Sequence, residues 1–195
     1  MPRNFSCLTL AIGVGVSEAL SDIGANGIQL KWPNDLVLND GKLGGILTEI
    51  QSGKGESESE SITVVIGIGL NLDMQGHLAG VTSGIGQISD LRQAMTELPG
   101  RMQIAAAVIE RLVRTLLKFE DDGFSSFSAQ WKRIDWLAGK HTRVETPFGN
   151  VDGVASGIDD DGALLVRRGS ELDRVVSGTV TLLPTSDRQT GTGND

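Results

Sequence analysis

Residues 31–50 read KWPNDLVLNDGKLGGILTEI, and strand-forming runs alternate in them with residues that interrupt strands. Pro33 has no backbone N–H to donate to a sheet, and it keeps the preceding residue extended. The apolar run at residues 36–38 then meets Asp40-Gly41, a pair favoured in two-residue hairpin turns. We therefore expect a strand, a proline stop, a second strand, a tight turn and a third strand, with Asn39 opposite Lys42.

The third of these strands, which begins at Lys42, carries one cation and two glycines. Strand side chains alternate between the two faces of a sheet. We expect one face to hold Lys42, Gly44, Ile46 and Thr48. The other face then holds Leu43, Gly45 and Leu47. A cation beside a strand stripped of side chains suits a flat, anionic ligand.

Residues 62–72 repeat this pattern on a second strand. Their even positions are all apolar, which predicts a face packed on the core. The odd positions are Thr63, Val65, Gly67, Gly69 and Asn71. Taken alone, each glycine is better explained by a bulge or by tight packing than by a ligand. Four glycines on two neighbouring strands, edged by Lys42 and Asn71, favour a groove for a ligand.

Three motifs in this region resemble the central signatures of biotin–protein ligases. They are KWPNDL at residues 31–36, KLGGILTE at 42–49 and GIGLNL at 67–72, and their order and spacing match as well. The resemblance covers residues 6–183. It implies an α+β fold, with a mixed β-sheet flanked by helices as in biotin ligases and class II aminoacyl-tRNA synthetases. A small SH3-like β-barrel is expected to follow that sheet.

The resemblance and the residue patterns together divide the chain into three parts. Residues 1–138 are expected to form part of a biotin ligase catalytic domain, with helices at 6–23, 101–120 and 124–136. Residues 139–183 hold short strands separated by turns, which is typical of a small barrel. Residues 184–195 have nothing apolar to bury, and we expect them to be disordered.

Ligases of this family join the carboxylate of biotin to the α-phosphate of ATP with Mg²⁺, and then transfer biotin to a carrier lysine. The resemblance makes Lys42 the catalytic cation between the two anions. It places Asn34, Asp35 and Asn71 around the adenylate, with Asp35 near Mg²⁺ through the phosphates. Lys31 is expected to support them, although a surface salt bridge is an alternative for this residue. The glycines expected to lie against biotin are Gly44, Gly45, Gly67 and Gly69.

One family motif is not found among these residues. Biotin ligases carry a loop rich in glycine and arginine that folds over biotin, and no such stretch occurs in the 195 residues. The catalytic domain is therefore expected to be truncated at its N-terminal side, and residues 1–195 to turn over weakly or not at all. Two alternatives stay open: a non-catalytic binding module that pairs through an open sheet edge, and ligation of lipoate on the related fold.

Composition limits the partners and the compartment. The net charge of −8 gives no basic footprint for nucleic acid. Cys7 is the only cysteine, which is compatible with a reducing cytoplasm. The longest apolar runs, residues 8–16 and 62–72, are too short to span a bilayer. We expect a cytoplasmic protein whose partners are the biotin carboxyl carrier domain of acetyl-CoA carboxylase or a related carboxylase, and a possible second copy, with no nucleic acid or membrane.

Overall fold

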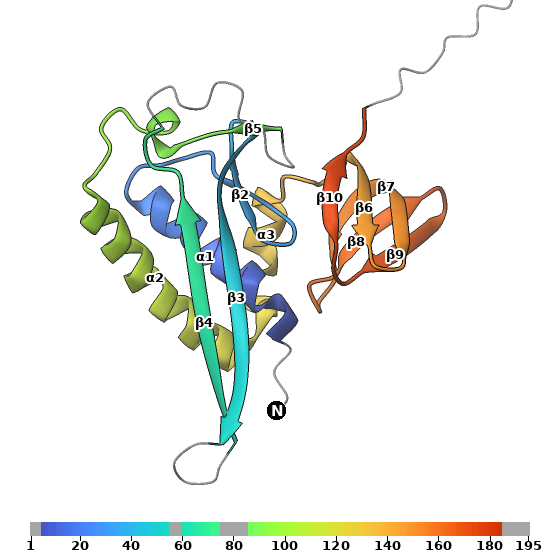
Figure 1. Ribbon diagram of the computed structural model, residues 1–195, viewed down its shortest axis with the longest axis horizontal. Helices are drawn as coiled ribbons and strands as arrows, with labels where there is room; N and C mark the ends of the chain where they lie inside the picture. The colour runs from blue at the N-terminus through green and yellow to red at the C-terminus, as the bar shows by residue number, and fades with distance from the viewer. Residues whose placement is uncertain (1–4, 55–59, 75–85, 185–195) are drawn as a thin grey trace, which may run out of the picture.

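The computed structural model describes residues 5–54, 60–74 and 86–184, and it contains two separate five-stranded sheets (Figure 1). In the first sheet the strand order is β1–β2–β3–β4, and β5 pairs with β3. The strands are β1 (Gln29–Lys31), β2 (Asp35–Leu38), β3 (Gly41–Lys54), β4 (Glu60–Leu70) and β5 (Gln87–Ile88). The pairing of β3 with β5 is parallel and the others are antiparallel, so the predicted mixed sheet and α+β class are confirmed.

Helices cover one face of this sheet. The α-helices are α1 (Leu8–Asp22), α2 (Arg101–Asp122) and α3 (Ser128–Ile134). Short 3₁₀ turns are η1 (Phe5–Cys7), η2 (Leu91–Gln93) and η3 (Phe124–Ser126). Helix α1 packs on the sheet and on α2, which explains why it is apolar on almost every side. The continuous helix predicted at residues 124–136 is wrong, because the chain forms η3 and then the shorter α3.

The hairpin between β2 and β3 is shifted by one residue from its predicted register. Asn39 and Asp40 form the turn with φ of 50° and 58°, and Leu38 pairs with Gly41. Lys42 therefore lies opposite Val37 and not opposite Asn39. The reason is that Asn and Asp both tolerate the positive φ that a two-residue turn requires, so glycine is not needed in it.

A β-bulge in β3 then changes which residues share a face. Gly44 pairs with Leu36 and Lys42 with Val37, which leaves Leu43 as an extra residue. Beyond the bulge the alternation is reversed, and Ile46 is buried in the core instead of sharing a face with Lys42. The predicted face of Lys42, Gly44, Ile46 and Thr48 is therefore wrong. Gly45 takes the place next to the ammonium group of Lys42.

The second sheet follows α3 and has the order β10–β6–β7–β8–β9. Its strands are β6 (His141–Thr146), β7 (Gly149–Ile158), β8 (Leu164–Arg168), β9 (Glu171–Val175) and β10 (Thr179–Leu182). All neighbours are antiparallel, and these short strands agree with the strands and turns predicted for residues 139–183. Closure into an SH3-like barrel and the domain boundary at residue 138 stay predictions. Of the predicted disordered tail, residues 185–195 lie outside the described part of the chain.

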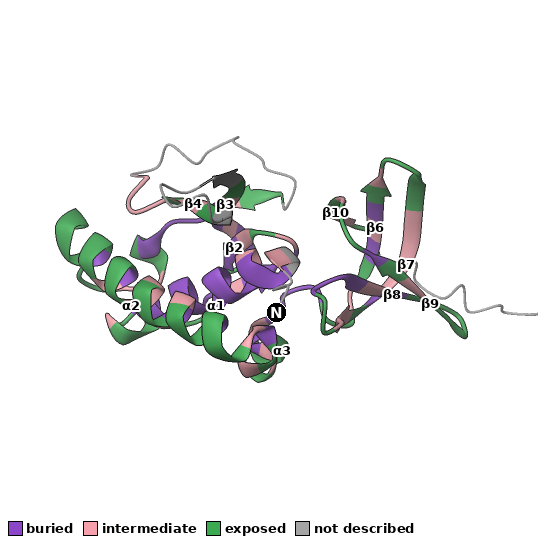
Figure 2. Ribbon diagram, turned by 90° about the horizontal axis from the view of Figure 1, so that it is seen from below, coloured by how far each residue is buried: buried purple, intermediate pink, exposed green. Residues whose placement is uncertain are grey.

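Two tryptophans connect the sheets. The indole N–H of Trp32 donates to the carbonyl oxygen of Gly162 at 2.9 Å. The indole N–H of Trp136 donates to Asp40 Oδ1 at 2.8 Å, and the ammonium of Lys140 lies 3.6 Å from the centre of its ring. Buried residues are found in the helices and in strands of both sheets (Figure 2). Within the described ranges, no helix has both the length and the apolar character needed to cross a membrane.

Cys7 is a reporter of the contact between the two sheets. Its thiol is 1% exposed and donates to the carbonyl oxygen of Asp160 at 3.6 Å. Burial, together with the charges of Asp161 and Asp159, raises the pKa of Cys7 to about 11. At pH 8 the thiolate fraction is then roughly 200-fold below that of a free cysteine. We expect iodoacetamide to label native Cys7 at least that much more slowly than the urea-unfolded chain. Equal labelling rates would show that the sheets separate readily.

Asp135 makes the stability of the chain depend on pH. Burial raises the pKa of Asp135, and the backbone N–H of Leu137, which donates to Oδ1 at 2.9 Å, opposes the rise. Because the folded state holds the proton more tightly than the unfolded state, the wild type loses stability as pH rises through that raised pKa. Asp135→Asn keeps the acceptor oxygen and has no charge. We expect the variant to have the higher melting temperature at pH 7, and the difference to shrink towards pH 4. A difference independent of pH would contradict this.

Candidate functional site

Asp35 lies between two lysines at the start of β2. Its Oδ1 is 2.5 Å from the ammonium nitrogen of Lys42, and its Oδ2 is 3.7 Å from that of Lys31. Lys31 is only 4% exposed, so the alternative of a surface salt bridge is wrong for this residue. Burial lowers the pKa of Lys31, and the neighbouring Asp35 carboxylate opposes that shift. The side chain of Lys42 is 35% exposed, so it is the member of this trio that an anion can reach.

Gly45 lies next to Lys42, and Gly69 and Gly67 continue from it along β4, so the backbone of β3 and β4 is uncovered there. A Cβ placed on Gly45 would lie 3.8 Å from the Lys42 nitrogen and 3.6 Å from Asp35 Oδ1. A Cβ on Gly67 or Gly69 would have no neighbour closer than 3.7 Å, and both residues are exposed. We refer to Gly45, Gly67 and Gly69 as the glycine surface. The uncovered backbone and the adjacent ammonium group allow a flat ligand with an anionic end to lie on it.

Gly44 has a different reason to be glycine. It is buried, and a Cβ on it would lie 2.1 Å from the carbonyl oxygen of Gly69 on the neighbouring strand. The close approach of β3 and β4 therefore requires glycine at this position. Tight packing, one of the two alternatives for each glycine, applies here, and a contact of Gly44 with a ligand stays a prediction.

Both predicted amides are engaged with backbone oxygens. The Asn34 amide donates to the carbonyl oxygen of Ile46 at 2.8 Å. The Asn71 amide donates to the carbonyl oxygens of Lys42 at 3.2 Å and Ser89 at 3.1 Å. These bonds hold the loop before β2 and the end of β4 against β3, close to Lys42. The predicted contacts of Asn34 and Asn71 with an adenylate stay predictions.

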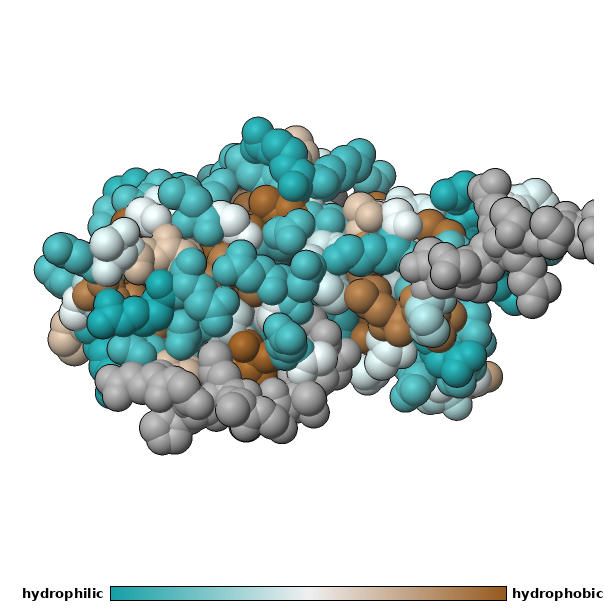
Figure 3. Space-filling model, turned by 90° about the horizontal axis from the view of Figure 1, so that it is seen from above, coloured by the Kyte–Doolittle hydropathy of each residue, from teal (hydrophilic) through white to brown (hydrophobic). Residues whose placement is uncertain are grey.

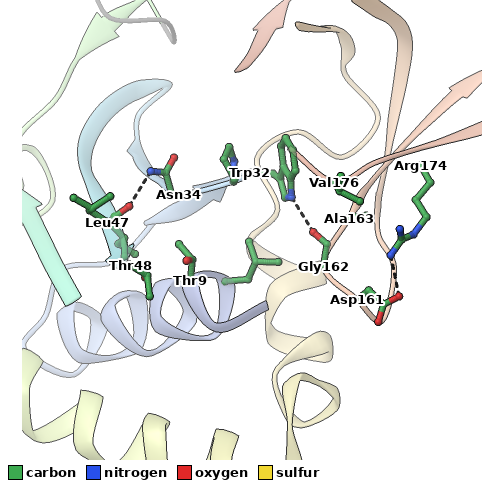
Figure 4. Close-up of a pocket in the computed structure, with 13 residues that line it drawn as sticks. Thr9, Trp32, Asn34, Leu47, Thr48, Asp161, Gly162, Ala163, Arg174 and Val176 are labelled. Atoms are coloured by element: carbon green, nitrogen blue, oxygen red, sulfur yellow. Dashed lines mark hydrogen bonds and ion pairs between the residues drawn. The ribbon is translucent and has the colours of Figure 1, made fainter. Parts of the chain in front are cut away.

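A cleft of 460 Å³ opens between the first sheet, α1 and the turns of the second sheet (Figure 4). The residues lining it include Thr9, Trp32, Asn34, Leu47, Thr48 and Arg174. The guanidinium of Arg174 is paired with Asp161 at 2.9 Å and with Asp159, so its charge is already neutralised. Sequence reasoning missed Thr9 and Arg174 at this place, because they come together only through contacts between the sheets.

The glycines of the glycine surface do not line the cleft, although Leu47, which does, lies 3.7 Å from the position of a Cβ on Gly67. The cleft is lined by Asn34 and Leu47 but not by Lys42, Gly67 or Gly69. The cation of the cleft, Arg174, is already paired with two carboxylates. The charge of Lys42 and the uncovered backbone therefore favour the glycine surface over the cleft as the place for an anionic ligand. The 460 Å³ volume of the cleft is the one property that favours the cleft as the ligand site.

A directly bound metal does not fit these residues. Across residues 5–54, 60–74 and 86–184 there is no group of three or more His, Cys, Asp or Glu side chains placed to hold one. Both oxygens of Asp35, the predicted metal residue, face lysine ammonium groups. The predicted contact of Asp35 with Mg²⁺ through nucleotide phosphates stays a prediction.

Comparisons with known proteins agree with the motifs. Residues 1–71 match the model of the Biotin/lipoate A/B protein ligase family, and residues 138–183 match the Biotin protein ligase C terminal domain. The chain is 33% identical over 184 residues to the bifunctional ligase/repressor BirA of Salmonella typhimurium. It belongs to the biotin protein ligase family. The biotin--[acetyl-CoA-carboxylase] ligase of Mycobacterium tuberculosis is 30% identical to this family member over 184 residues.

The chain spans about half the length of the curated relatives it matches. The alignments cover 90% of the chain but 52% of the Salmonella protein and 62% of the mycobacterial one. Solved structures agree in fold. Biotin protein ligase from Aquifex aeolicus gives a TM-score of 0.76 at 23% identity, covering 92% of this chain and 75% of that one. A second structure of that protein, in complex with biotin and ATP, gives 0.74 at 23% identity, covering 94% and 73%.

Proposed function

We propose that this chain carries the Lys42 side of an active site that joins biotin to ATP and then transfers biotin to a carrier lysine in the cytoplasm. The carrier is a biotin carboxyl carrier domain of acetyl-CoA carboxylase or a related carboxylase. One observation carries the proposal. The half-exposed ammonium of Lys42, held 2.5 Å from Asp35, borders backbone that Gly45, Gly67 and Gly69 leave uncovered.

The first step brings two anions together. A carboxylate oxygen of biotin attacks the α-phosphorus of ATP, a P–O bond forms, and the bond to the β-phosphate oxygen breaks to release pyrophosphate. A positive charge fixed near both reactants lowers the barrier by several kcal/mol. Lys42 is the exposed cation suited to this, because Asp35 holds its nitrogen at the edge of the glycine surface.

The second step transfers the acyl group. The amine of the carrier lysine attacks the acyl carbon of biotinyl adenylate, AMP leaves, and the amine releases its proton. Lys42 stabilises the phosphate oxygen of the leaving AMP in the same way. Lys31 is a positioning residue. It is buried on the side of Asp35 opposite Lys42, where it fixes the carboxylate that in turn fixes Lys42.

Calorimetry tests this proposal on residues 1–195. We expect heat of binding when biotin is titrated into the chain with ATP, and little or none when lipoate replaces biotin. Heat with lipoate and not with biotin would instead favour lipoate ligation. No heat with either would favour a non-catalytic module.

Turnover is a separate measurement. The glycine- and arginine-rich loop implied by the family resemblance is not among these 195 residues. We therefore propose that the chain by itself biotinylates a carrier domain slowly, with kcat below about 0.1 per second against about 10 for a median enzyme. A kcat above that value would contradict the proposed impairment while supporting the ligase function.

A further inference from the structure

Helix α2 is apolar on the side that faces away from the core. Its inner side buries Ile104, Val108, Thr115 and Phe119 against the rest of the chain. Its outer side carries exposed Met102, Ala106, Ile109, Val113 and Leu117, which we refer to as the outer stripe. Their exposed fractions include 82% for Met102 and 62% for Ile109. The outer side of α2 is exposed along its length in Figure 2.

The spacing of the outer stripe is that of a seam between helices. Successive members lie four, three, four and four residues apart, so they follow one line along the helix. Single exposed apolar residues are common, but a continuous line of them along a helix marks an interaction surface. By contrast, the face of the molecule seen from above is mainly hydrophilic, with hydrophobic residues in small separate groups (Figure 3).

Four of the five members of the outer stripe, from Ala106 to Leu117, come opposite one another when two helices run antiparallel. A two-fold axis midway between residues 111 and 112 of α2 brings Ile109 to within one residue, about 1.5 Å along the helix, of the level of Val113 of a second copy. The same axis brings Ala106 opposite Leu117, so a small residue faces a large one at each end of the contact. An isologous pair needs this kind of match between a surface and its own rotated image.

The charges beside the stripe match under the same axis. Glu110 and Arg114 lie on one flank of the stripe, are paired with each other at 2.5 Å, and are 68% and 67% exposed. In an antiparallel pair each flank meets the same flank of the second helix, so Glu110 comes within one residue of the level of Arg114 of the other copy. The chain as a whole has a net charge of −8, which opposes association elsewhere. This flank is neutral.

We infer that α2 is the contact surface for a second copy of this chain, packed antiparallel through the outer stripe. This surface differs from the open sheet edge expected from the sequence. A helix of 22 residues is about 33 Å long and about 10 Å wide, which gives a footprint of roughly 330 Å² per copy. Standard interfaces bury about 800 Å² per partner. The association is therefore weak, with a Kd on the order of 10–100 μM.

Sedimentation equilibrium of the full chain, from about 5 to 500 μM, tests this inference. We expect a monomer–dimer equilibrium for the wild type and only monomer for Val113→Lys. The matched control is Leu172→Lys, because Leu172 is 55% exposed on β9 in the other sheet and Val113 is 53% exposed. The control should associate like the wild type. A monomeric wild type over the whole range, or a Val113→Lys variant that still associates, would overturn the inference.

A charge exchange tests the antiparallel register and remains decisive if Val113→Lys disturbs the fold. Glu110→Arg and Arg114→Glu each place like charges opposite one another at two places, and each should raise the Kd about tenfold. The double variant restores both opposite-charge pairs and should associate like the wild type. Circular dichroism confirms that all three keep their helix content. Failure of the double variant to regain association would rule out this packing.

Discussion

Lys42→Met is expected to weaken the binding of a non-hydrolysable biotinyl-adenylate mimic by about 10- to 100-fold, measured by calorimetry. A hydrogen bond to a charged group contributes about 1.5–3 kcal/mol, which corresponds to this range. Lys42 is the exposed cation beside the glycine surface, and methionine keeps most of the length of the side chain without the charge. The fold should be retained, because Asp35 keeps Lys31 as an ion-pair partner.

The matched control for this variant is Lys118→Met. Lys118 is a lysine of α2 whose nitrogen lies 5.4 Å from the ring centre of Phe127, far from β3 in the chain. The Lys118→Met substitution removes one positive charge from the protein, as Lys42→Met does. Equal affinities of the two variants for the mimic would mean that Lys42 acts only through net charge, and its assignment as the reacting cation would fail.

Gly69→Val is expected to abolish binding of the same mimic while leaving the stability nearly unchanged. The new side chain would stand on the glycine surface, where the ligand is proposed to lie. A Cβ at this position has its nearest neighbour at 4.0 Å, so the strand can accept it, and valine favours strands. We expect the free energy of unfolding to change by less than about 0.5 kcal/mol. Wild-type affinity in this variant would show that the ligand does not use this surface.

Gly44→Ala is the opposite case on the same pair of strands. Its Cβ would meet the carbonyl oxygen of Gly69 at 2.1 Å, so the two strands must move apart. Overpacking of this kind costs about 1–3 kcal/mol, and we expect a loss of that size in urea unfolding. A stable Gly44→Ala variant would contradict the packing role of this glycine.

Sequence patterns predicted those parts of the fold that depend on local alternation and helical spacing. Along β4 the expected apolar face packs on the core from Val64 to Leu70, but Ile62 at its start is 52% exposed. Val65, Gly67 and Gly69 on the other face are exposed. Helix α2 was expected at residues 101–120 and runs to Asp122. Both results follow from periods of two and 3.6 residues, which depend little on the rest of the chain.

The register of β3 could not be predicted in this way. Both Asn39-Asp40 and Asp40-Gly41 are suitable turn pairs, and tertiary contacts choose between them. A Cβ on Gly41 would lie 3.1 Å from the backbone nitrogen of Ser89, so this glycine is used for the close approach of the segment around β5. The bulge at Leu43 then moves the following residues to the opposite faces, which no local pattern indicates.

For the candidate site, the motifs identified the residues but not their arrangement. The motif at residues 31–36 carries both Lys31 and Asp35, yet only the folded chain shows that this lysine is buried behind the carboxylate. In the same way, the four glycines read alike in the sequence. The distances separate Gly44, which lies against a neighbouring backbone, from Gly67 and Gly69, which are open.

Amide NMR of the 20.6 kDa chain, titrated with the biotinyl-adenylate mimic, distinguishes the glycine surface from the cleft. If biotinyl adenylate lies against the uncovered backbone beside Lys42, the largest shifts will be those of Gly45, Gly67 and Gly69. If the largest shifts fall instead on Trp32, Gly162 and Arg174 around the 460 Å³ cleft, or if no shifts occur, the ligand site proposed here does not exist.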